Sequence, residues 1–465
     1  MSTLKFTDPE HWKGIERHLG QPGGSGASSD ASSSASSGER FAFAYTRTIS
    51  NAGTGPVLEV VETVLVDELD TTRGVDGWYL SDRALDSIHN HALTTGYGIV
   101  EFHNHHHGPP AFSATDEDAL APTVVYCLEL LGGTPYGAAV WADGALHAEW
   151  WRVNRHGRVE RGQFTTVTVL GDQFRVLNAR PAAEERLARQ LPLLGTRAQA
   201  AIATMRVAVV GVGGTGSQLA QGLACLGFRN VLLMDDDLVE ISNLNRMVTA
   251  GYADVGQPKT AVTRKRMRAI DPLINVATAG AVTVAAEHPE LEDVDLIIGC
   301  VDNDGPRNRI NQIATRTRTP YLDIATGVDE TVEPFALGGR VILTAPHGPC
   351  LTCLGELDAA EIARWAKPPD QQQLDRLHGY GTGTANPSVV YLNGLAVNAA
   401  LTELAAWLSG ARPPAQWLDV DVIGDLGRPG TQIDPREVAG PNPGCITCAG
   451  GHRWRESLHP VLGAR

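Results

Sequence analysis

Two different patterns of hydrophobic residues meet near residue 180. Residues 8–19 carry apolar side chains at helical spacing and predict a short amphipathic helix. Strands are predicted over "RFAFAYTRTI", "VLEVVETVLV", "YGIVEFH", "GAAVWAD" and "ALHAEWWRV", and helices over "DRALDSIHNHALTTG" and from about Thr115 onwards. We therefore predict a mixed α/β domain over residues 1–180.

The second pattern consists of continuous apolar runs without alternation. Three of them are "RVAVVG", "NVLLMD" and "DVDLIIGCVDN", and helical stretches separate them. Such runs are typical of strands that are buried on both faces. They predict a doubly wound, mostly parallel, Rossmann-like sheet over residues 181–465. One longer run, "PSVVYLNGLAVNAALTELAAWL", contains two Asn and a Glu, and predicts a strand-like start and a buried helix instead of a membrane span.

Composition and charge exclude some functions. The 465 residues are enough for two or three domains, and the formal net charge of −15 disfavours a phosphate-binding surface for nucleic acid. Residues 21–38 are rich in Gly and Ser and predict a flexible linker. The start, "MSTLKFTDPEHWKG", lacks the apolar segment of a signal peptide, so we expect a reducing cytoplasmic location without membrane contact. Paired cysteines there favour metal over disulfides.

A glycine-rich turn is the first candidate site. The stretch "VVGVGGTGSQLAQGLACLG" places Gly211, Gly213, Gly214 and Gly216 between a predicted strand and a predicted helix. Glycine lets the backbone approach a phosphate closely, and the helix N-terminus offers free N–H groups. Asp235 ends the next strand, where it would bind a ribose hydroxyl. These features alone also fit an NAD or FAD site, or a plain tight turn.

Further charged residues favour phosphate chemistry. Arg246 and Lys259 would neutralise a triphosphate, and Asp302, at the end of another predicted strand, would hold Mg²⁺. Hydride transfer requires none of the three, so an NAD-dependent oxidoreductase is the weaker interpretation.

The order of motifs over residues 184–450 resembles the HesA/MoeB/ThiF family of ubiquitin-activating-type adenylyltransferases. The motifs are G-x-G-G-x-G, D-x-D-x-V-x-x-S-N-L-N-R, G-Q-P-K and D-N-x-x-x-R. The resemblance implies ATP-dependent adenylation of the C-terminal carboxylate of a ubiquitin-like or sulfur-carrier protein, with release of pyrophosphate. It implies that the nucleotide-binding residues are Gly211, Gly213, Gly214, Gly216, Asp235, Asp237, Asn243, Arg246, Lys259 and Asp302, the last through Mg²⁺.

The same resemblance implies a homodimer. The stretch "RLARQ" matches the family's R-x-x-R-Q, so Arg189 would reach the ATP of the partner subunit. The alternative for Arg189 is a solvated charge on a helix.

Two C-x-x-C pairs flanked by Gly and Pro predict a metal site. Cys350, Cys353, Cys445 and Cys448 suit a tetrahedral structural Zn²⁺, and two redox pairs are the alternative. Cys127, Cys225 and Cys300 lie in apolar patterns and are predicted to be core residues.

No cysteine lies between Cys353 and Cys445, where many family members carry the thiol that receives the activated carboxylate. The adenylate is therefore expected to pass to an E2-like or sulfur-donor partner, or to be the product itself.

The stretch "VEFHNHHHGPPAFSATDEDAL" holds the pattern H-x-H-x₇-S-x-x-D. It resembles the JAMM (JAB/MPN⁺) zinc metallopeptidase motif, which implies a cytidine-deaminase-like fold. His103, His105 and Asp116 would bind Zn²⁺, with one position open for water. Glu39 would take the proton of that water and Ser113 would bind the oxyanion.

Other interpretations of this stretch remain open. Glu59 and Glu62 are rivals of Glu39, and Ser113 with Asp116 also fits a helix capping box without metal. Asn104 and His106 replace the family's usual Ser and Pro, while His106 and His107 are expected to be exposed non-ligands.

The leading hypothesis is a bifunctional enzyme that adenylates a ubiquitin-like or sulfur-carrier protein and processes that protein, or its conjugates, as a zinc (iso)peptidase. An alternative is nucleotidylation of a short ribosomal peptide, as in microcin-type maturation, with a metal domain that trims the peptide or is inactive. A third is a scaffold with an inactive metal domain.

Overall fold

The computed structural model describes residues 2–21, 39–51, 54–73, 78–106, 108–180, 184–283, 286–329, 336–367, 371, 388–423 and 431–448. The predicted linker lies almost wholly outside the described residues. The chain forms two compact units, residues 1–180 and 181–465, each of which is described by itself.

In the first unit, the described strands form one nine-stranded sheet in the order β11-β10-β1-β3-β2-β6-β7-β8-β9, with a separate β4-β5 pair. The strands are β1 (Thr3–Phe6), β2 (Phe41–Ser50), β3 (Val57–Leu65), β4 (Thr71–Arg73), β5 (Trp78–Leu80), β6 (Gly98–Asn104), β7 (Tyr136–Ala142), β8 (Ala145–Val153), β9 (Val159–Gln163), β10 (Thr166–Val169) and β11 (Arg175–Val176). The helices are α1 (Pro9–Leu19), α2 (Asp82–Thr95) and α3 (Ala114–Leu130). The predicted mixed α/β pattern of this region is confirmed.

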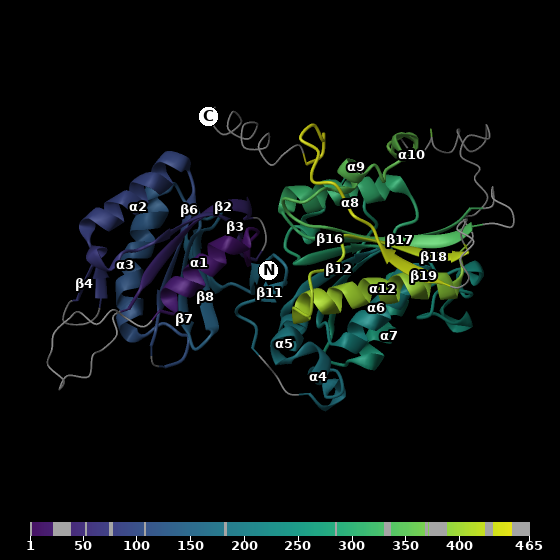
Figure 1. Cartoon of the computed structure of the whole chain (residues 1–465), viewed down its shortest axis with the longest axis horizontal. Helices are drawn as coiled ribbons and strands as arrows, with labels where there is room; N and C mark the ends of the chain where they lie inside the picture. Colours follow the sequence, from purple (N-terminus) through teal and green to yellow (C-terminus); the bar gives the residue numbers. More distant parts are fainter. Residues whose placement is uncertain are drawn as a thin grey trace. The chain divides into compact units, whose positions relative to one another are not determined.

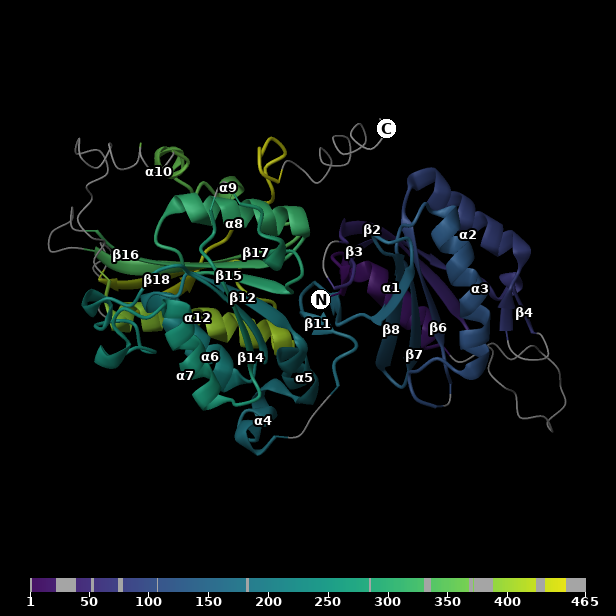
Figure 2. The ribbon, with the colours of Figure 1, turned by 180° about the vertical axis from the view of Figure 1, so that it is seen from behind.

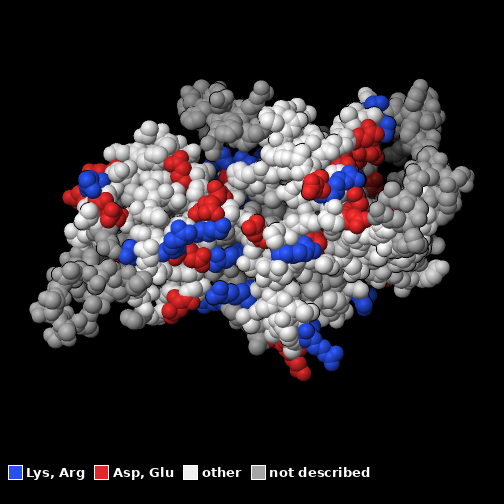
Figure 3. All heavy atoms as spheres, in the orientation of Figure 1, with Lys and Arg blue, Asp and Glu red and all other residues white. Residues whose placement is uncertain are grey.

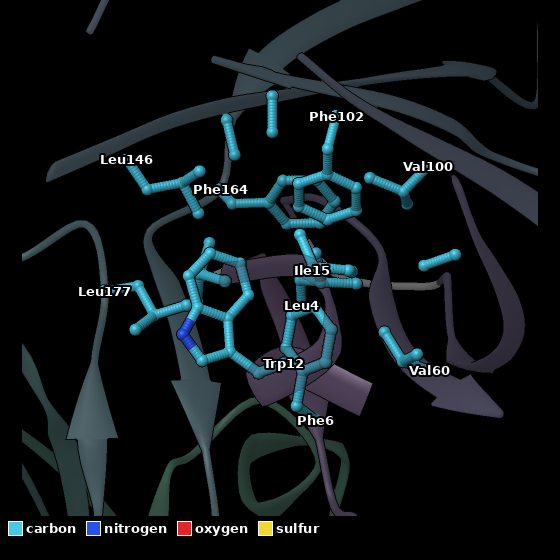
Figure 4. Close-up of a cluster of buried hydrophobic side chains, with 14 of the residues drawn as sticks. Leu4, Phe6, Trp12, Ile15, Val60, Val100, Phe102, Leu146, Phe164 and Leu177 are labelled. Carbon is cyan, nitrogen blue, oxygen red and sulfur yellow. The ribbon is translucent and has the colours of Figure 1, made fainter. Parts of the chain in front are cut away.

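Helix α1 covers one face of this sheet. Asp8 caps it by accepting a 2.9 Å hydrogen bond from the backbone N–H of Glu10. Its buried side chains, Trp12, Ile15 and Leu19, recur at helical spacing and pack against sheet residues such as Phe102 (Figure 4). Each such fully buried side chain contributes roughly 1.5–3 kcal/mol relative to exposure.

Helices α2 and α3 cover the opposite face. Their buried residues, including Ile88 and Leu120, share a core with Phe43 and Tyr136 of the sheet. Because side chains alternate along β6, Phe102 points towards α1 and His103 points towards α2 and α3. The fold therefore places His103 under the N-terminal end of α3.

In the second unit, the described strands form an eight-stranded sheet in the order β14-β13-β12-β15-β16-β17-β18-β19. They are β12 (Arg206–Val210), β13 (Asn230–Met234), β14 (Asn275–Ala279), β15 (Leu296–Gly299), β16 (Tyr321–Asp329), β17 (Ala336–Thr344), β18 (Trp417–Ile423) and β19 (Gln432–Pro435). The helices are α4 (Leu191–Leu194), α5 (Thr196–Thr204), α6 (Gly214–Leu226), α7 (Lys259–Ile270), α8 (Asp304–Thr317), α9 (Leu351–Leu354), α10 (Ala359–Trp365) and α12 (Val390–Ser409).

The predicted doubly wound, mostly parallel sheet is confirmed for β12 to β16, all of which pair in parallel. Strands β17, β18 and β19 extend it in antiparallel fashion, which the apolar runs did not predict. Both views show α6, α7 and α12 on one face and α8, α9 and α10 on the other (Figures 1 and 2). The expected strand-like start of α12 is wrong in the described residues 388 and 389, which precede the helix without forming a strand.

Charged side chains of both signs lie on the surface. On the face shown in Figure 3, acidic and basic side chains of the described residues lie side by side. Among the described residues, no helix combines the length and the apolar character needed to cross a bilayer.

Candidate functional site

The glycine-rich turn lies where the sheet of the second unit reverses its winding direction. Strand β12 pairs with β13 on one side and with β15 on the other, and the turn at its carboxyl end leads into α6. Open α/β sheets bind ligands at such a switch point, outside the carboxyl ends of the strands. The residues that follow β13 and β15 therefore lie at the same edge of the sheet as the glycine turn.

The glycines of the turn meet three different constraints. Gly211 has φ +88°, and a Cβ there would lie 2.7 Å from the carbonyl oxygen of Cys300. A Cβ on Gly216 would overlap the carbonyl oxygen of Gly211, so this glycine lets the helix pack on the strand. A Cβ on Gly213 would have no atom within 4 Å, so its position is open towards the place a nucleotide would occupy.

Asp235 is bonded directly to this turn. Its carboxylate accepts hydrogen bonds from the backbone N–H of Val212 at 2.7 Å and from that of Asp237 at 2.9 Å. Burial raises the pKa of Asp235 above its ordinary value, against these two hydrogen bonds. The carboxylate is thus fixed beside the glycines, where a ribose hydroxyl would meet it.

Two cations lie at the same edge of the sheet. A Cβ on Gly214 would contact the aliphatic stem of Arg246 at 3.0 Å, which places this side chain at the N-terminus of α6. Lys259 begins α7, is buried, and pairs through Nζ with the carboxylate of Asp237 at 2.7 Å. Asn243 accepts a hydrogen bond from the backbone N–H of Glu240 and shapes the loop that carries Arg246.

Asp302 follows β15 and is exposed, and the adjoining segment is held by the buried Arg307. Arg307 donates to the carbonyl oxygen of Val301 at 2.8 Å, to Asp323 at 3.0 Å, and to Asp304. Arg307 is the last residue of the D-N-x-x-x-R motif, and the sequence alone gave no role for it. Its contacts fix the backbone on both sides of Asp302.

Asn393 of α12 is a further residue that sequence reasoning missed. It is fully buried, and its amide approaches the position that a Cβ on Gly214 would occupy. Its Oδ1 accepts a hydrogen bond from Thr326 of β16 at 3.0 Å. An isolated Asn in an apolar helical pattern gives a weak signal, because only the fold brings α12 against the turn.

Arg189 lies away from the glycine turn of its own chain. The next residue, Gln190, donates to the carbonyl oxygen of Leu226 at 2.8 Å, at the C-terminal end of α6. The turn lies at the N-terminal end of this helix of 13 residues, which spans about 18 Å. Arg189 is exposed and therefore available to another molecule.

The four paired cysteines converge where α9 meets the segment that carries Cys445 and Cys448. The Sγ separations are 3.9 Å for Cys350 and Cys353, 3.7 Å for Cys350 and Cys445, and 3.1 Å for Cys353 and Cys448. Sulfur ligands about 2.3 Å from a tetrahedral Zn²⁺ lie about 3.8 Å apart. The sulfur positions therefore fit one structural zinc ion better than two separate redox pairs.

In the first unit, His103, His105 and Asp116 form a second group of possible metal ligands, whose ligand atoms lie within 4.8 Å of one another. Nε2 of His103 lies 3.5 Å from Oδ1 of Asp116, and Nε2 of His105 lies 3.2 Å from Oδ2. Nitrogen and oxygen ligands of a tetrahedral Zn²⁺ lie about 3.4 Å apart. Nε2 of His103 is also buried without a hydrogen-bond partner among the described atoms, which suits a ligand awaiting a cation.

The electrostatics of this group match a cation site. Burial opposes ionisation of Asp116, but the adjacent imidazoles of His103 and His105 hold the pKa of its carboxyl well below the ordinary value. The pKa of His105 is raised by its hydrogen bond to Asp116, against burial, and further by the charge of Glu39. The carboxylate of Asp116 thus stays ionised beside two imidazole rings, and a metal ion bound by the three side chains would compensate its charge.

Glu39 reaches the group through the register of β2 and β6. Phe41 pairs with His103, and the same register carried two residues further brings Glu39 opposite His105. Asn104 fixes this approach, because its Oδ1 accepts a hydrogen bond from the backbone N–H of Arg40 at 2.7 Å. Asn104 is buried and also donates to the carbonyl oxygen of Leu19, a role that the sequence did not reveal.

The rival glutamates are engaged elsewhere. Glu59 is buried and bonded to Thr7 at 2.9 Å and to Arg47, and Glu62 is bonded to His91 at 2.9 Å. Ser113 forms the capping box of α3: its Oγ accepts from the N–H of Asp116 at 3.2 Å, and its own N–H donates to Asp116. The capping box and the ligand group coexist, because Asp116 offers two oxygens.

Comparison with known proteins assigns the second unit to a family. The family model described as ThiF matches residues 186–423, about half of the chain. The chain belongs to the ThiF family. The residues before 186, including the histidine group, lie outside this match.

Curated relatives match about a third of this ThiF-family chain. It is 34% identical over 161 residues to the molybdopterin-synthase adenylyltransferase of Escherichia coli, which is 34% of this chain and 62% of that protein. It is 33% identical over 166 residues to the sulfur carrier protein adenylyltransferase of Thermus thermophilus, or 35% of this chain and 60% of that protein. The chain thus spans about three fifths of the length of these relatives.

Among solved structures, the chain is similar to E. coli MccB in complex with MccA-N7isoASN. The TM-score is 0.44 at 19% identity, and the match covers 58% of this chain and 75% of that one.

The ThiF-family unit also corrects one expectation about cysteines. Cys225 is exposed on α6, because the buried positions Leu223 and Ala224 direct it towards solvent. Cys300 is half-buried, and Cys127 in the first unit is buried as predicted. Burial raises the pKa of Cys127 to about 12, so this thiol is unreactive at neutral pH.

Proposed function

We propose that this chain is a bifunctional enzyme of the cytoplasm. Its second unit adenylates the C-terminal carboxylate of a ubiquitin-like or sulfur-carrier protein with ATP, and its first unit is a JAMM-type zinc (iso)peptidase that processes that protein or its conjugates. The observation that carries the first activity is the convergence of the glycine turn, Asp235, Arg246 and Lys259 at the switch point of the sheet.

In the adenylation reaction, a carboxylate oxygen of the substrate attacks the α-phosphorus of ATP. The new bond is an acyl–phosphate bond, and the bond between the α-phosphorus and the bridging oxygen breaks, so that pyrophosphate leaves with the electron pair. Arg246 and Lys259 neutralise the phosphate charge that develops, and Asp235 holds the ribose. Asp302 is the residue of this chain that would hold Mg²⁺, which would supply further charge compensation.

Lys259 is poised for this role by Asp237. In the absence of nucleotide the ammonium group is paired with the Asp237 carboxylate, whose side chain is 67% exposed. A triphosphate offers the ammonium a stronger partner, so Asp237 positions Lys259 and then releases it. Its role is therefore positioning, beyond the direct nucleotide contact expected from the sequence.

A homodimer completes the site. Because Arg189 lies at the far end of α6 from its own glycine turn, the guanidinium group acts in the site of a second copy, where it binds phosphate oxygens. The RLARQ motif and the exposure of Arg189 support this arrangement.

The fate of the adenylate follows from the missing thiol. Since no cysteine lies between Cys353 and Cys445, the activated carboxylate passes to a thiol or sulfur donor of a separate, E2-like or sulfur-transfer partner. The same absence supports the second candidate function, in which the nucleotidylated C-terminus of a short ribosomal peptide is itself the product. The four-cysteine site would hold a Zn²⁺ with a structural role. This ion would join the segment of Cys445 and Cys448 to α9 and take no part in the reaction.

For the peptidase reaction, His103, His105 and Asp116 would hold Zn²⁺, which would supply Lewis-acid activation of water and carbonyl. Glu39 takes the proton from the attacking water and delivers it to the leaving amine. Ser113 donates its hydroxyl proton to the developing oxyanion, while a lone pair of the same oxygen still accepts from the N–H of Asp116. The peptidase proposal rests on the spacing of the ligand atoms: the oxygens of Asp116 lie 3.5 Å from Nε2 of His103 and 3.2 Å from Nε2 of His105.

The two activities concern one chemical group. A peptidase that cleaves after the terminal residue of a ubiquitin-like protein exposes the carboxylate that the adenylation site activates. One chain could therefore prepare a precursor and then activate it, or remove conjugates later.

The experiment is incubation of the zinc-loaded full chain with ATP, Mg²⁺ and a candidate ubiquitin-like protein that carries a C-terminal extension. Intact mass spectrometry detects both reactions, as loss of the extension and as gain of AMP. Gain of AMP on a short peptide, and none on the carrier protein, favours the second candidate. Asp302→Ala should remove the gain of AMP and keep the loss of the extension. Glu39→Gln should remove both changes on the extended protein and keep the gain of AMP on the same protein supplied without its extension. A chain that produces neither change with any carrier or peptide contradicts the proposal.

A further inference from the structure

The first turn of α3 carries Asp116 but has no apolar anchor. None of the residues 113–119 is buried, and Leu120 is the first buried side chain of this helix. His103, by contrast, lies on β6 in the middle of the sheet. Besides the ring of Phe112, which precedes the helix and packs against the core, the position of Asp116 relative to the histidines therefore depends on polar contacts between this turn and the sheet.

Arg161 of β9 makes the main contact of this kind. Its guanidinium group binds both carboxylate oxygens of Glu117, the residue next to Asp116, at 2.8 and 2.6 Å. Its Nε donates to Glu149 of β8 at 2.5 Å, and the group lies 5.2 Å from the ring centroid of Trp151. A planar fork bound on two sides fixes both distance and orientation, which a single charge does not.

The same network extends to the surroundings of His103. Glu149 is buried and binds Nε2 of His147 at 2.8 Å. The ring of Phe112 lies between two histidines, 5.4 Å from that of His147 and 6.2 Å from that of His103. Glu117, Arg161, Glu149 and His147 thus join the ligand-bearing turn to the strands beside the ligand histidines.

We propose that Arg161 is a positioning residue that sets the affinity of the His103, His105 and Asp116 site for Zn²⁺. The inference rests on the proposed metal centre of the first unit. Arg161 touches none of the three ligands, and it acts by holding the first turn of α3 at the distance where Asp116 completes the ligand set. Without the fork, Glu117 and Glu149 repel each other and the turn can move away from the sheet.

The chain offers a matched control on the same hairpin. Arg152 of β8 pairs with Glu160 of β9 at 3.0 Å and lies 5.3 Å from the ring centroid of Trp150. Trp150 belongs to the core on the α1 side of the sheet, away from the metal group. Arg152 therefore shares the chemistry of Arg161, an Arg–Glu pair stacked on Trp, but not its connection to α3.

The test is a Co²⁺ titration of the metal-free full chain, with Zn²⁺ and a chelator in competition. Thiolate charge-transfer absorption reports the four-cysteine site, so the remaining Co²⁺ absorption reports the histidine site separately. We expect Arg161→Gln to weaken Zn²⁺ binding at the histidine site about fivefold, because a partly exposed arginine–glutamate pair contributes up to about 1 kcal/mol. Arg152→Gln should leave this affinity within about twofold, and both should leave the cysteine site unchanged.

Two further variants separate positioning from folding. Glu117→Gln removes the same contact from the half-exposed helix side and should reproduce the loss with an unchanged circular dichroism spectrum. Arg161→Lys keeps the charge without the fork and should recover only part of the affinity. Equal affinities for Arg161→Gln, Glu117→Gln and the unmodified chain overturn the inference alone. Absence of metal from the histidine site of the unmodified chain overturns the proposed metal centre and the inference together.

Discussion

At the scale of single residues, the glycine turn shows how one motif can contain different physical requirements. Gly211 is needed for its positive φ, and Gly216 for the close contact of α6 with the turn. Gly213 meets neither requirement, since its φ of −84° is ordinary and the space around it is empty. The open space beside Gly213 is therefore available to a ligand. Experiment can distinguish a glycine that the fold requires, such as Gly216, from one that a ligand requires, such as Gly213.

We expect Gly216→Ala to destabilise the second unit by about 1–3 kcal/mol, the usual cost of overpacking, because the new methyl group meets the backbone of Gly211. Gly213→Ala should leave the melting temperature unchanged and weaken ATP binding by roughly tenfold or more, since a lost backbone contact to a charged phosphate costs about 1.5–3 kcal/mol. Thermal melting and calorimetric titration with ATP separate the two. A large loss of stability in Gly213→Ala would show that this glycine is structural.

Arg307 gives a second prediction at this scale. We expect Arg307→Lys to raise the Mg²⁺ concentration that half-saturates ATP–pyrophosphate exchange several-fold, because a lysine cannot hold Val301, Asp304 and Asp323 together and Asp302 then loses its fixed backbone. The KM for ATP at saturating Mg²⁺ should change little. Arg307→Ala should cost about 3 kcal/mol, the lower end of the range for a broken buried pair, because Asp323 then keeps only Tyr321 and the more distant Arg340 as partners. An unchanged Mg²⁺ dependence in a folded Arg307→Lys enzyme would contradict the positioning role.

At the scale of elements, α12 shows how a polar contact can hold an apolar helix. Glu403 is buried near its C-terminal end, binds Arg412 through both carboxylate oxygens, and accepts the N–H of Ala415 at 2.7 Å. These contacts fix the connection that leads from α12 to β18. The helix is apolar around most of its circumference, so its pattern predicted burial but not this attachment.

The Glu403 contact predicts a pH dependence of stability. Burial alone would raise the pKa of Glu403, but hydrogen bonds from Arg412 and Ala415 outweigh it and lower the pKa below the ordinary value. The contribution to the free energy of unfolding is therefore complete above the unfolded pKa of about 4.3 and is lost as the pH falls through the folded pKa.

Glu403→Gln should accordingly melt at a lower temperature than the unmodified chain at pH 7. The difference in melting temperature should shrink as the pH is lowered from about 5 to below 4, because Glu403 of the unmodified chain then becomes protonated and loses its charge. Melting curves at several pH values check this. A difference that stays constant over that range would exclude the charged contact as its source.

At the scale of the whole molecule, the proposed adenylation site needs two copies of the chain. Arg189 is expected to complete the site of the partner, whereas Asp302 serves the site of its own chain. Arg189→Ala and Asp302→Ala should therefore each be inactive in pyrophosphate exchange when purified alone.

Mixing the two inactive variants, with exchange of subunits, should restore about a quarter of the normal activity. Random reassociation makes half of the dimers mixed, and each mixed dimer contains one complete site out of two. Size-exclusion chromatography of the same samples verifies the dimer. Mixtures that stay inactive although mixed dimers form would show that Arg189 acts within its own chain or does not act at all.

The sequence by itself determined the local requirements of this protein. Apolar periodicity predicted α1, the parallel strands β12, β13 and β15, and the helix α12, because burial on one face or on both leaves a direct pattern in the chain. Motif spacing likewise indicated which residues could bind phosphate or metal, since turns and helix caps need particular residue types at fixed offsets. Glu39 could be proposed in this way but not distinguished from Glu59 and Glu62.

Only the tertiary structure decided which distant residues meet. The register of β2 against β6 brought Glu39 close to the histidine group, the packing of α12 brought Asn393 to the glycine turn, and the fork of Arg161 joined α3 to the sheet. Cys225 was misjudged for the same reason, because an apolar pattern does not specify which side of a helix the remaining chain will cover. Contacts between residues far apart in sequence depend on the shared packing of whole elements, and no local pattern encodes them.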